Sequence, residues 1–207
     1  MDEALRLSQR HTQGVVVTKV QTQGRGRFNR TWVSDSGNFY GTFFLKYDAP
    51  QGALSLNMAY HLFCTLQPFF ETGLSIKWPN DLLFEDQKIA GILLEHHAPL
   101  LLIGIGVNLK NSPQNINQKT TSLFEAKNIE LDPIDFLKHL EQGFMEALQK
   151  PFTEIKNDYS KHMAFINQKI TISNLTGILE GINFDGSLIL KNELGLHTIL
   201  TGDVIAL

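Results

Sequence analysis

The sequence contains a single cysteine among its 207 residues, and this scarcity excludes two kinds of site. One cysteine cannot form an internal disulfide, and it cannot supply a cysteine-rich metal site. Cys64 lies in an apolar stretch, which predicts a small buried side chain without a chemical role. No apolar run reaches membrane-spanning length, and no signal peptide precedes the first acidic residues, so we expect a cytoplasmic protein.

Charge is also scarce, because only 19% of the residues are charged and the formal net charge is −3. No overall field therefore draws the chain to nucleic acid or to an anionic membrane, and any anion-binding function must be local. The sequence has no Gly-x-x-x-x-Gly-Lys-Ser/Thr phosphate loop. His96 and His97 are adjacent, so on a strand they point to opposite faces and do not chelate one metal ion. An apolar content of 43% predicts one folded domain, with or without a small appendage.

Hydrophobic patterns predict a mixture of strands and helices up to residue 166. Strands are predicted at 15–17, 39–47, 74–77, 82–84, 89–95 and 100–109. Helices are predicted at 2–10, 53–70, 133–148 and 152–165. The apolar run at 100–109 is typical of a central strand, and Gly104 and Gly106 within it indicate that a ligand or another backbone comes close.

The pattern changes after Asn167. Five short strands are predicted at 169–173, 177–182, 187–191, 196–200 and 204–207. Asp185-Gly186 is typical of a tight turn between two of them. We therefore divide the chain into an α+β domain at 1–166 and a small β-barrel at 167–207.

A long loop is predicted at 21–37, and long loops in compact domains tend to be functional. It contains the run Gly24-Arg25-Gly26-Arg27. Glycines let backbone N–H groups turn inward and arginines add charge, so this loop has the chemistry to cradle an anion. A solvated basic loop is an equal alternative on these four residues alone. Nucleic-acid binding is disfavoured, because three arginines on an acidic chain are a weak footprint.

Two further pieces carry polar side chains at the ends of predicted strands. Lys77 and Trp78 are consecutive, so they point to opposite faces, and the turn at Pro79-Asn80-Asp81 holds the lysine rigidly. This indicates either a fixed cation beside a carboxylate or phosphate, or a surface lysine that caps a strand. Asn108 ends the last strand of the α+β domain, where it either hydrogen-bonds a base edge or satisfies a turn.

In their order and spacing, these pieces resemble the biotin–protein ligase family (biotin–acetyl-CoA-carboxylase ligases). The resemblance covers nearly the whole chain, and it is to the monofunctional type that lacks an N-terminal DNA-binding domain. The segments that carry it are Gly24-Arg25-Gly26-Arg27 with Trp32, Lys77-Trp78-Pro79-Asn80-Asp81, Lys88-Ile89-Ala90-Gly91-Ile92-Leu93, residues 104–109 and Thr121-Ser122-Leu123. The implied fold is α+β: a mixed sheet packed with helices, as in class II aminoacyl-tRNA synthetases and biotin ligases, plus a C-terminal SH3-like β-barrel.

The resemblance also implies a two-step reaction. The biotin carboxylate attacks the α-phosphate of ATP, which arrives with Mg²⁺, and the products are biotinyl-5′-AMP and pyrophosphate. A lysine of the biotin carboxyl carrier protein of acetyl-CoA carboxylase then attacks this mixed anhydride. The implied partners are biotin, ATP and the carrier, with no nucleic acid and no membrane, and the choice between monomer and homodimer stays open.

The same resemblance implies which residues form the site. The implied catalytic residues are Arg25, Arg27 and Lys77. The implied biotin-binding residues are Gln21, Arg25, Gly26, Arg27 and Lys77. The implied ATP-binding residues are Arg25, Arg27, Trp32, Asn80, Lys88 and Asn108, and no residue is implied as a metal ligand. Apart from the resemblance, cations are the residues that this chemistry needs. A carboxylate and a phosphate about 4 Å apart repel by about 4 kcal/mol at an effective dielectric of about 20, and nearby cations offset this repulsion.

The sequence departs from the family pattern at two points. Family members carry a strand and a Ser-Thr-Asn segment before the helix that Asp2-Glu3-Ala4-Leu5 resembles, whereas Met1 stands there here. We expect either a start codon assigned too late or a truncated biotin pocket. Asn29 replaces a glycine of the arginine loop, and asparagine tolerates a left-handed backbone.

These departures leave two alternatives to an active biotin ligase. One is a non-catalytic relative that binds biotin or ATP, and the other is a ligase for another acyl acid such as lipoate. Because the DNA-binding domain of the family is not seen in the sequence, no repressor role is expected.

Overall fold

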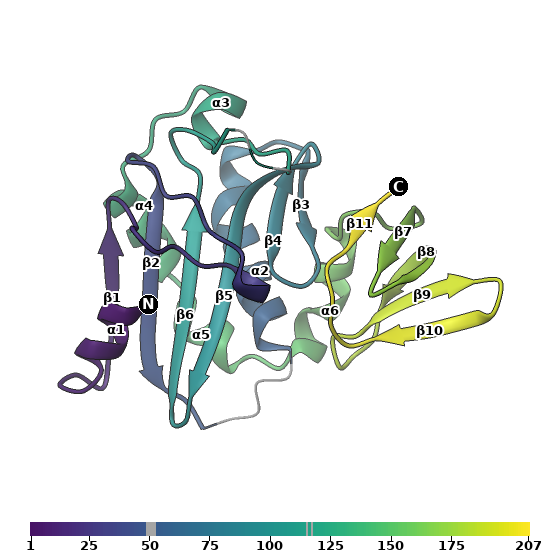
Figure 1. Ribbon diagram of the computed structural model, residues 1–207, viewed down its shortest axis with the longest axis horizontal. Coiled ribbons are helices and arrows are strands. Elements are labelled where there is room, and N and C mark those ends of the chain that lie inside the picture. Colours follow the sequence, from purple (N-terminus) through teal and green to yellow (C-terminus); the bar gives the residue numbers. More distant parts are fainter. Residues whose placement is uncertain (49–52, 115, 117) are drawn as a thin grey trace.

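The computed structural model describes residues 1–48, 53–114, 116 and 118–207. Its main sheet has six strands (Figure 1), in the order β1 (Gln13–Thr18), β2 (Phe39–Lys46), β6 (Leu100–Val107), β5 (Gln87–His97), β4 (Asp81–Phe84) and β3 (Leu74–Lys77). Each of the six strands predicted before residue 166 is present. The prediction that 100–109 is a central strand is confirmed, because β6 lies third in this order.

Short turns join β4 to β5 and β5 to β6, so these neighbouring strands pair antiparallel. Glu85 and Asp86 have φ values of +47° and +62°, and they form the tight turn between β4 and β5. β5 and β6 form a long hairpin in which His97 lies opposite Leu100. Antiparallel strands can be joined in this way, whereas parallel ones need a crossover. The α+β class is confirmed, and the sheet that we expected to be mixed is instead antiparallel in every pairing between named strands of the described residues.

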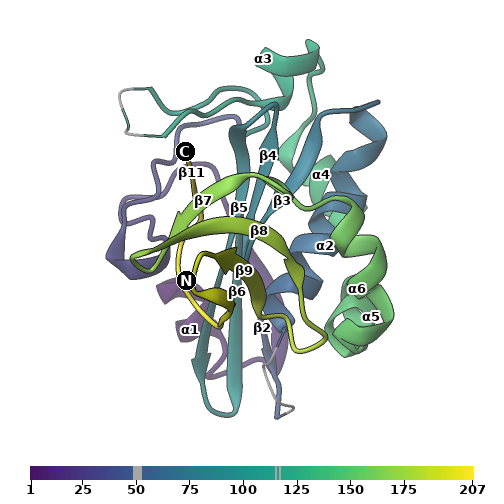
Figure 2. The same ribbon diagram turned by 90° about the vertical axis from the view of Figure 1, so that its right-hand side faces the viewer.

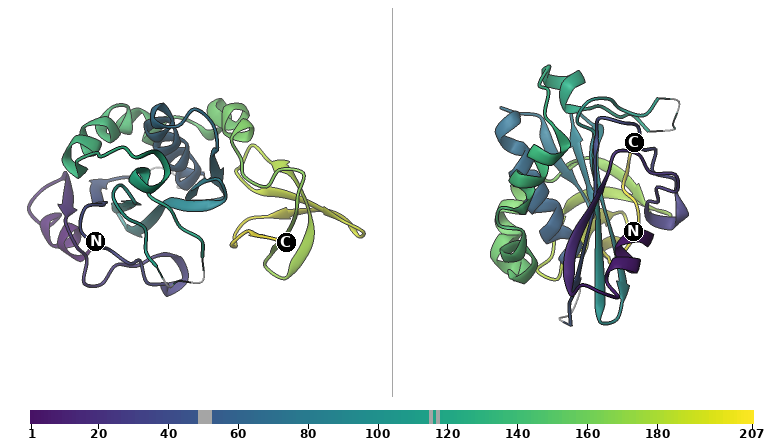
Figure 3. Two further views of the ribbon diagram at one scale, coloured as in Figure 1. Left: turned by 90° about the horizontal axis from the view of Figure 1, so that it is seen from above. Right: turned by 90° about the vertical axis from the view of Figure 1, so that its left-hand side faces the viewer.

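Helices cover one face of the main sheet (Figure 3), and they are α2 (Leu54–Leu66), α4 (Pro133–Glu141), α5 (Phe144–Gln149) and α6 (Phe152–Lys161). The core lies between them and the sheet, where Leu62 of α2 and Ile103 of β6 are fully buried. The prediction that Cys64 is buried is wrong, because this residue lies on the exposed side of α2. No helix in the described ranges is long and apolar enough to cross a membrane.

One predicted helix ends early and another is divided, each for a local reason. The 53–70 helix stops at Leu66 and tightens into the 3-10 turn Gln67–Phe69, where Pro68 has no backbone N–H to continue the α-helical bonds. The 133–148 helix divides into α4 and α5 at Gly143, whose φ is +76°. Apolar spacing continues through this break, which explains why the sequence predicted one helix.

Smaller elements complete the first part of the chain. Residues Asp2–Leu7 form α1, and its fully buried Ala4 packs against Phe44 and Leu102 on the sheet face opposite the four helices. The sequence did not predict the short helix α3 (Leu123–Lys127), which is capped by the Ser122 hydroxyl accepting from the backbone N–H of Glu125.

The C-terminal residues form a second antiparallel sheet (Figure 2), in the order β10 (Gly195–Ile199), β9 (Leu188–Asn192), β8 (Leu175–Ile182), β7 (Lys169–Ile172) and β11 (Ile205–Ala206). Strands β7 to β10 follow one another as a meander, and β11 returns to pair with β7. The prediction of five short strands after Asn167 is confirmed. Asp185-Gly186 lies in the turn between β8 and β9, as predicted.

This turn also joins the two sheets. Trp78, which follows β3, donates a hydrogen bond from Nε1 to the Gly186 carbonyl oxygen at 2.9 Å. A Cβ atom on Gly186 would lie 2.6 Å from Leu56 Cδ1 and 3.1 Å from Ala53 Cβ, so the turn packs closely against the start of α2. The close packing that positions the C-terminal sheet therefore requires glycine at position 186.

We predict that Gly186→Ala lowers the free energy of unfolding more than Gly195→Ala does. Both glycines have positive φ, at +87° and +117°, but a Cβ on Gly195 meets nothing within 4 Å. We expect about 1–2 kcal/mol from backbone strain alone at Gly195, and about 1–3 kcal/mol more at Gly186 from overpacking. Urea unfolding followed by circular dichroism measures both, and equal losses would contradict this packing argument.

Candidate active site

A cavity of about 650 Å³ lies on the sheet face that the four helices leave free. Residues of β2, β5 and β6 form its floor, the loop at 21–33 covers it, and residues 203–206 close one end. The basic side chains that line it outnumber the acidic ones, as Arg25, Arg27, Arg30, Lys77, Lys88 and Lys119 against Asp81, Asp86 and Asp203. The cavity is therefore locally positive in a chain whose net charge is −3.

Every residue that the resemblance implied as a site residue lines this one cavity: Gln21, Arg25, Gly26, Arg27, Trp32, Lys77, Asn80, Lys88 and Asn108. They come from the loop, from β3 and the turn after it, from β5 and from the end of β6. The fold thus brings together segments that are up to 87 positions apart in the sequence.

The arginine loop, residues 24–32, folds back on itself as a small arch. The Gly26 N–H donates to the Arg30 carbonyl oxygen at 2.7 Å, and the Trp32 N–H donates to the Gly24 carbonyl oxygen at 2.9 Å. At its tip Phe28 and Asn29 have φ values of +54° and +58°. Asn29 thus has the left-handed backbone that asparagine tolerates better than most residues. The same conformation at Phe28 was not predicted, since an aromatic residue adopts it at a cost.

Arg25 is held at one end of the cavity by two carboxylates. Its guanidinium donates to Asp2 Oδ1 at 2.7 Å and to Glu95 Oε1 at 3.1 Å. These bonds to charged acceptors raise the pKa of Arg25 above its ordinary value. The side chain is 38% exposed, so solvent is still in contact with it.

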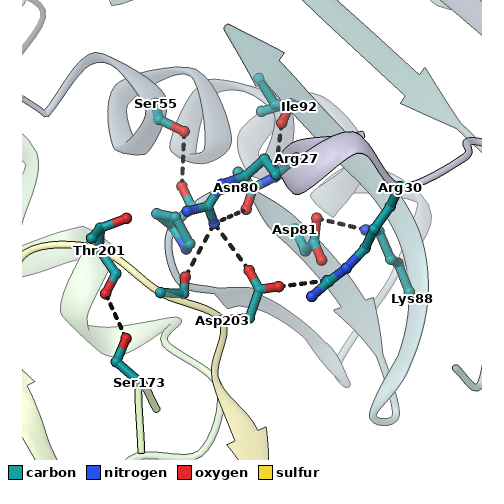
Figure 4. Close-up of polar contacts among 12 residues, drawn as sticks. Arg27, Arg30, Ser55, Asn80, Asp81, Lys88, Ile92, Ser173, Thr201 and Asp203 are labelled. Atoms are coloured by element: carbon teal, nitrogen blue, oxygen red, sulfur yellow. Dashed lines mark hydrogen bonds and ion pairs between the residues drawn. The ribbon is translucent and has the colours of Figure 1, made fainter. Parts of the chain in front are cut away.

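Arg27 and Arg30 are held at the other end (Figure 4). Arg27 Nη1 donates to Asn80 Oδ1 at 3.1 Å and to Asp203 Oδ1 at 3.2 Å. Arg30 forms an ion pair with the second oxygen of the same carboxylate. Asn80 is fixed in turn, because its side-chain amide donates to the Ile92 carbonyl oxygen at 2.8 Å.

The Lys77 amine differs from the three arginines and from Lys88, because no side-chain hydrogen bond or ion pair is found for it within the part of the chain that the structure describes. The Lys119 amine has none there either, but Lys119 is exposed, whereas Lys77 is half-buried. Burial is the main cause that lowers the pKa of its amine, and Asp81 opposes this shift while Lys88 adds to it. Lys88 has its own partner, Asp81 Oδ1, at 2.7 Å. The predicted alternation is confirmed: Lys77 lines the cavity, whereas Trp78 is buried in the core.

Trp32 lies against the sheet floor where two strands carry glycine. A Cβ on Gly106 would lie 2.6 Å from the indole ring, and one on Gly91 would lie 2.9 Å from it. Lys88 Nζ lies 5.1 Å from the ring centroid, within reach of a cation–π contact. The glycine pattern of β6 did indicate a close approach, but the group that approaches Gly106 is an indole and not a backbone.

Asn108 and Gln21 already make bonds within the protein. Asn108 is 2% exposed, and its side-chain amide donates to the Thr121 carbonyl oxygen at 3.0 Å. This favours the satisfied-turn interpretation for the amide nitrogen, although the residue also lines the cavity. Gln21 Oε1 accepts from the Ser34 hydroxyl at 2.8 Å.

Sequence reasoning missed five charged residues that line this cavity, namely Arg30, Asp81, Asp86, Lys119 and Asp203. Arg30 was part of the predicted basic loop, and Asp81 was part of the turn after Lys77, so both lay in segments of interest. Asp203 had no local signal, because it is one carboxylate between short C-terminal strands. Its position relative to Arg27, 176 residues earlier, becomes visible only in the folded chain.

Residues 1–109 match the family described as Biotin/lipoate A/B protein ligase family. This chain belongs to that family. It is 32% identical to the biotin--[acetyl-CoA-carboxylase] ligase of Paracoccus denitrificans, over 91% of this chain and 88% of that protein. It is 28% identical to the ligase of the same name from Mycobacterium tuberculosis, over 93% and 79% of the two chains.

Solved structures agree with this assignment to the biotin/lipoate ligase family. The biotin protein ligase from Aquifex aeolicus in complex with biotin and ATP is similar to this chain with a TM-score of 0.87 and 28% identity. The similarity covers 98% of this chain and 93% of that one. The family resemblance seen in the sequence motifs is confirmed.

We predict that Gly106→Ala displaces Trp32 whereas Gly104→Ala does not. A Cβ at 2.6 Å from the indole is closer than real contacts allow, so the ring must move, whereas a Cβ on Gly104 would meet its neighbours at an ordinary 3.5 Å. Tryptophan emission should shift to longer wavelength in Gly106→Ala only. The second tryptophan, Trp78, is common to both variants, so identical spectra would contradict the proposed packing.

Proposed function

We propose that this chain attaches biotin to a specific lysine of the biotin carboxyl carrier protein of acetyl-CoA carboxylase, using ATP. Biotinyl-5′-AMP is the intermediate, and AMP and pyrophosphate are the other products. The observation that carries this proposal is a locally positive cavity with one half-buried amine, Lys77, that has no protein partner among the described residues. Similarity to ligases whose names specify biotin supports this choice of acid.

The first step places like charges against each other. The biotin carboxylate must approach the α-phosphorus of a polyanion, and each such contact at about 4 Å costs about 4 kcal/mol at an effective dielectric of about 20. Lys77, Arg25 and Arg27 offset this repulsion, and they stabilise the charge that develops as the pyrophosphate leaves. Lys77 contributes most in this proposal, because its charge is not already matched by a protein carboxylate.

The two substrates take different parts of the cavity in this proposal. Biotin lies beside Gln21, Arg25, Gly26, Arg27 and Lys77. The nucleotide lies beside Arg25, Arg27, Trp32, Asn80, Lys88 and Asn108. Support for the second set comes from Trp32, a flat aromatic surface on the cavity floor, and from the neighbouring Lys88 amine at 5.1 Å from its centroid.

The second step needs positioning rather than a nucleophile of the enzyme. The neutral amine of the carrier lysine attacks the acyl carbon of the mixed anhydride and forms an amide bond. The bond from this carbon to the phosphate oxygen breaks, AMP leaves with its electrons, and the amine proton passes to water. Effective molarity from orientation accelerates such a transfer. The arginine loop covers the cavity and limits the access of water, which would otherwise consume the anhydride.

Mg²⁺ enters this proposal as part of the nucleotide substrate. Such ions take most of their ligands from phosphates and water, with one or two carboxylates from the protein. In the ranges that the structure describes, no group of three or more His, Cys, Asp or Glu side chains is placed to hold a metal. Asp81 lines the cavity and fits the part of a single carboxylate near the phosphates.

We propose that the two sheets belong to two domains with different roles. Residues 1–166 form the catalytic domain, and residues 167–207 form a smaller β domain whose last strand region closes one end of the cavity. We place the reaction in the cytoplasm, with the carrier as the acceptor. Because the matching family description includes lipoate ligases, another acyl acid is the second candidate substrate.

We predict that Lys77→Met lowers biotin-dependent exchange of labelled pyrophosphate into ATP by about 10²–10³-fold, as expected when a cation is removed from a developing charge. Lys46→Met, which removes an exposed lysine at the end of β2, should leave the exchange unchanged. Near-wild-type exchange in Lys77→Met would contradict the role given to this amine. Exchange that depends on lipoate and not on biotin would favour the second candidate, and binding without any exchange would indicate a non-catalytic relative.

We also predict that Lys77→Met raises the thermal midpoint at pH 7. Burial lowers the pKa of Lys77 in the folded state, so the folded state carries a desolvation cost that is fully present below that pKa. This cost disappears as the pH rises toward the unfolded value of about 10.4. The difference in Tm between Lys77→Met and wild type should therefore shrink in alkaline buffer, and differential scanning calorimetry over this pH range checks the sign.

A further inference from the structure

The arginine loop and the C-terminal sheet meet at one carboxylate, that of Asp203 (Figure 4). Its Oδ1 accepts from Arg27 Nη1 at 3.2 Å, and its Oδ2 lies 2.5 Å from Arg30 Nη1. The Gly202 carbonyl oxygen accepts a further bond from Arg27 Nη1 at 3.2 Å. The Arg27 and Asp203 side chains are only 21% and 23% exposed, so salt and solvent screen this pair less than they screen a surface pair. The Arg30 side chain is 67% exposed, so its pair with Asp203 is screened more strongly.

The backbone around Asp203 is anchored on both sides. Gly202 has a φ of +144°, and a Cβ there would lie 2.6 Å from Ser173 Oγ. The Ser173 hydroxyl donates to the Thr201 carbonyl oxygen at 3.1 Å. On the other side Val204 is 1% exposed, and β11 then pairs with β7. The carboxylate is therefore presented to the loop from a fixed point of the C-terminal sheet.

The contact lies where the cover of the cavity meets its end wall. Arg27 and Arg30 belong to the loop that covers the cavity, and residues 203–206 belong to the segment that closes one end. If the two separated, water would reach the cavity at this place. An acyl-adenylate is an anhydride that water hydrolyses, so the closure determines whether it survives until the amine attacks.

We propose that Asp203 is a positioning residue that holds the arginine loop closed and so retains the acyl-adenylate until the acceptor lysine arrives. This inference rests on the proposed function. Asp203 acts through Arg27 and Arg30 rather than on the reacting atoms. Its removal should therefore affect the fate of the intermediate more than the rate at which it is made.

The first experiment compares Asp203→Asn with Glu180→Gln. Both remove one carboxylate charge from the C-terminal part, but Glu180 pairs with Lys191 on the surface of the sheet and does not line the cavity. Each protein makes the adenylate from biotin and ATP in the presence of pyrophosphatase. Chromatography then measures two amounts, the biotin that hydrolysis releases from the adenylate and the carrier that has been modified. Asp203→Asn should lose the adenylate about tenfold faster than wild type, the factor expected for one charge-assisted contact. Its kcat for pyrophosphate exchange should fall by a smaller factor than its retention of the adenylate, and Glu180→Gln should match wild type in both.

Further variants separate positioning from general destabilisation. Asp203→Glu keeps the charge and should restore much of the retention. Arg30→Gln removes the contact from the loop side, so it should also speed the loss. The double variant Asp203→Asn with Arg30→Gln should lose the adenylate no faster than the faster single variant, because both changes remove one interaction. Wild-type retention in Asp203→Asn, or effects that multiply in the double variant, would overturn the proposal.

A last measurement does not depend on catalysis. Trypsin cleaves after Arg27 and Arg30, and cleavage requires the loop to leave the carboxylate. Without ligands, the loop of Asp203→Asn should be cut about tenfold faster than that of wild type or Glu180→Gln. If the wild-type chain makes no adenylate, the proposed function fails while this comparison still tests the contact. Equal cleavage rates in the three proteins would overturn the role of Asp203.

Discussion

Positive charges line the cavity on the open face of the main sheet, and their mutual repulsion is the constraint that the rest of the site depends on. Like charges about 4 Å apart repel by about 4 kcal/mol at an effective dielectric of about 20, so such a group is stable only with carboxylates placed among its members. The pairs are Arg25 with Asp2 and Glu95, Arg27 and Arg30 with Asp203, and Lys88 with Asp81. Lys77 has no such partner in the described part of the chain. Lys119 also lacks one there, but it is exposed to solvent, so Lys77 is the half-buried cation of the wall whose charge is not compensated.

Two glycines shape the floor of the cavity, because the absence of a side chain leaves space above the sheet. Strands β5 and β6 carry Gly91 and Gly106, and the space above them holds the indole of Trp32. On the other side of β6, Ile103 and Ile105 are buried in the core between the sheet and the helices. The period of two along a strand thus separates a packed face from an open one, and the arginine loop is seated on the open face through Trp32.

Much of this arrangement follows from local sequence, and the rest depends on contacts between distant segments. The alternation of Lys77 and Trp78 is a property of neighbouring residues, so it could be predicted. The break at Gly143 was hidden by apolar spacing that continues on both sides of it. Cys64 was misjudged because apolar residues surround it in sequence, while its angular position on α2 points to solvent. Asp203 reaches Arg27 only after the C-terminal sheet has folded and docked.

The hydrogen bond of Trp78 to the C-terminal sheet affects the whole molecule. It is adjacent to Lys77, yet its Nε1 bonds to Gly186 in the C-terminal sheet, so one dipeptide faces the cavity on one side and the neighbouring sheet on the other. The two sheets therefore do not behave as interchangeable modules. A graft that replaced residues 167–207 with another β-sheet would leave the indole N–H without its acceptor and would free the strand end that carries the amine. We expect the two parts to melt in one cooperative transition and to accept substitutions as a single evolutionary unit.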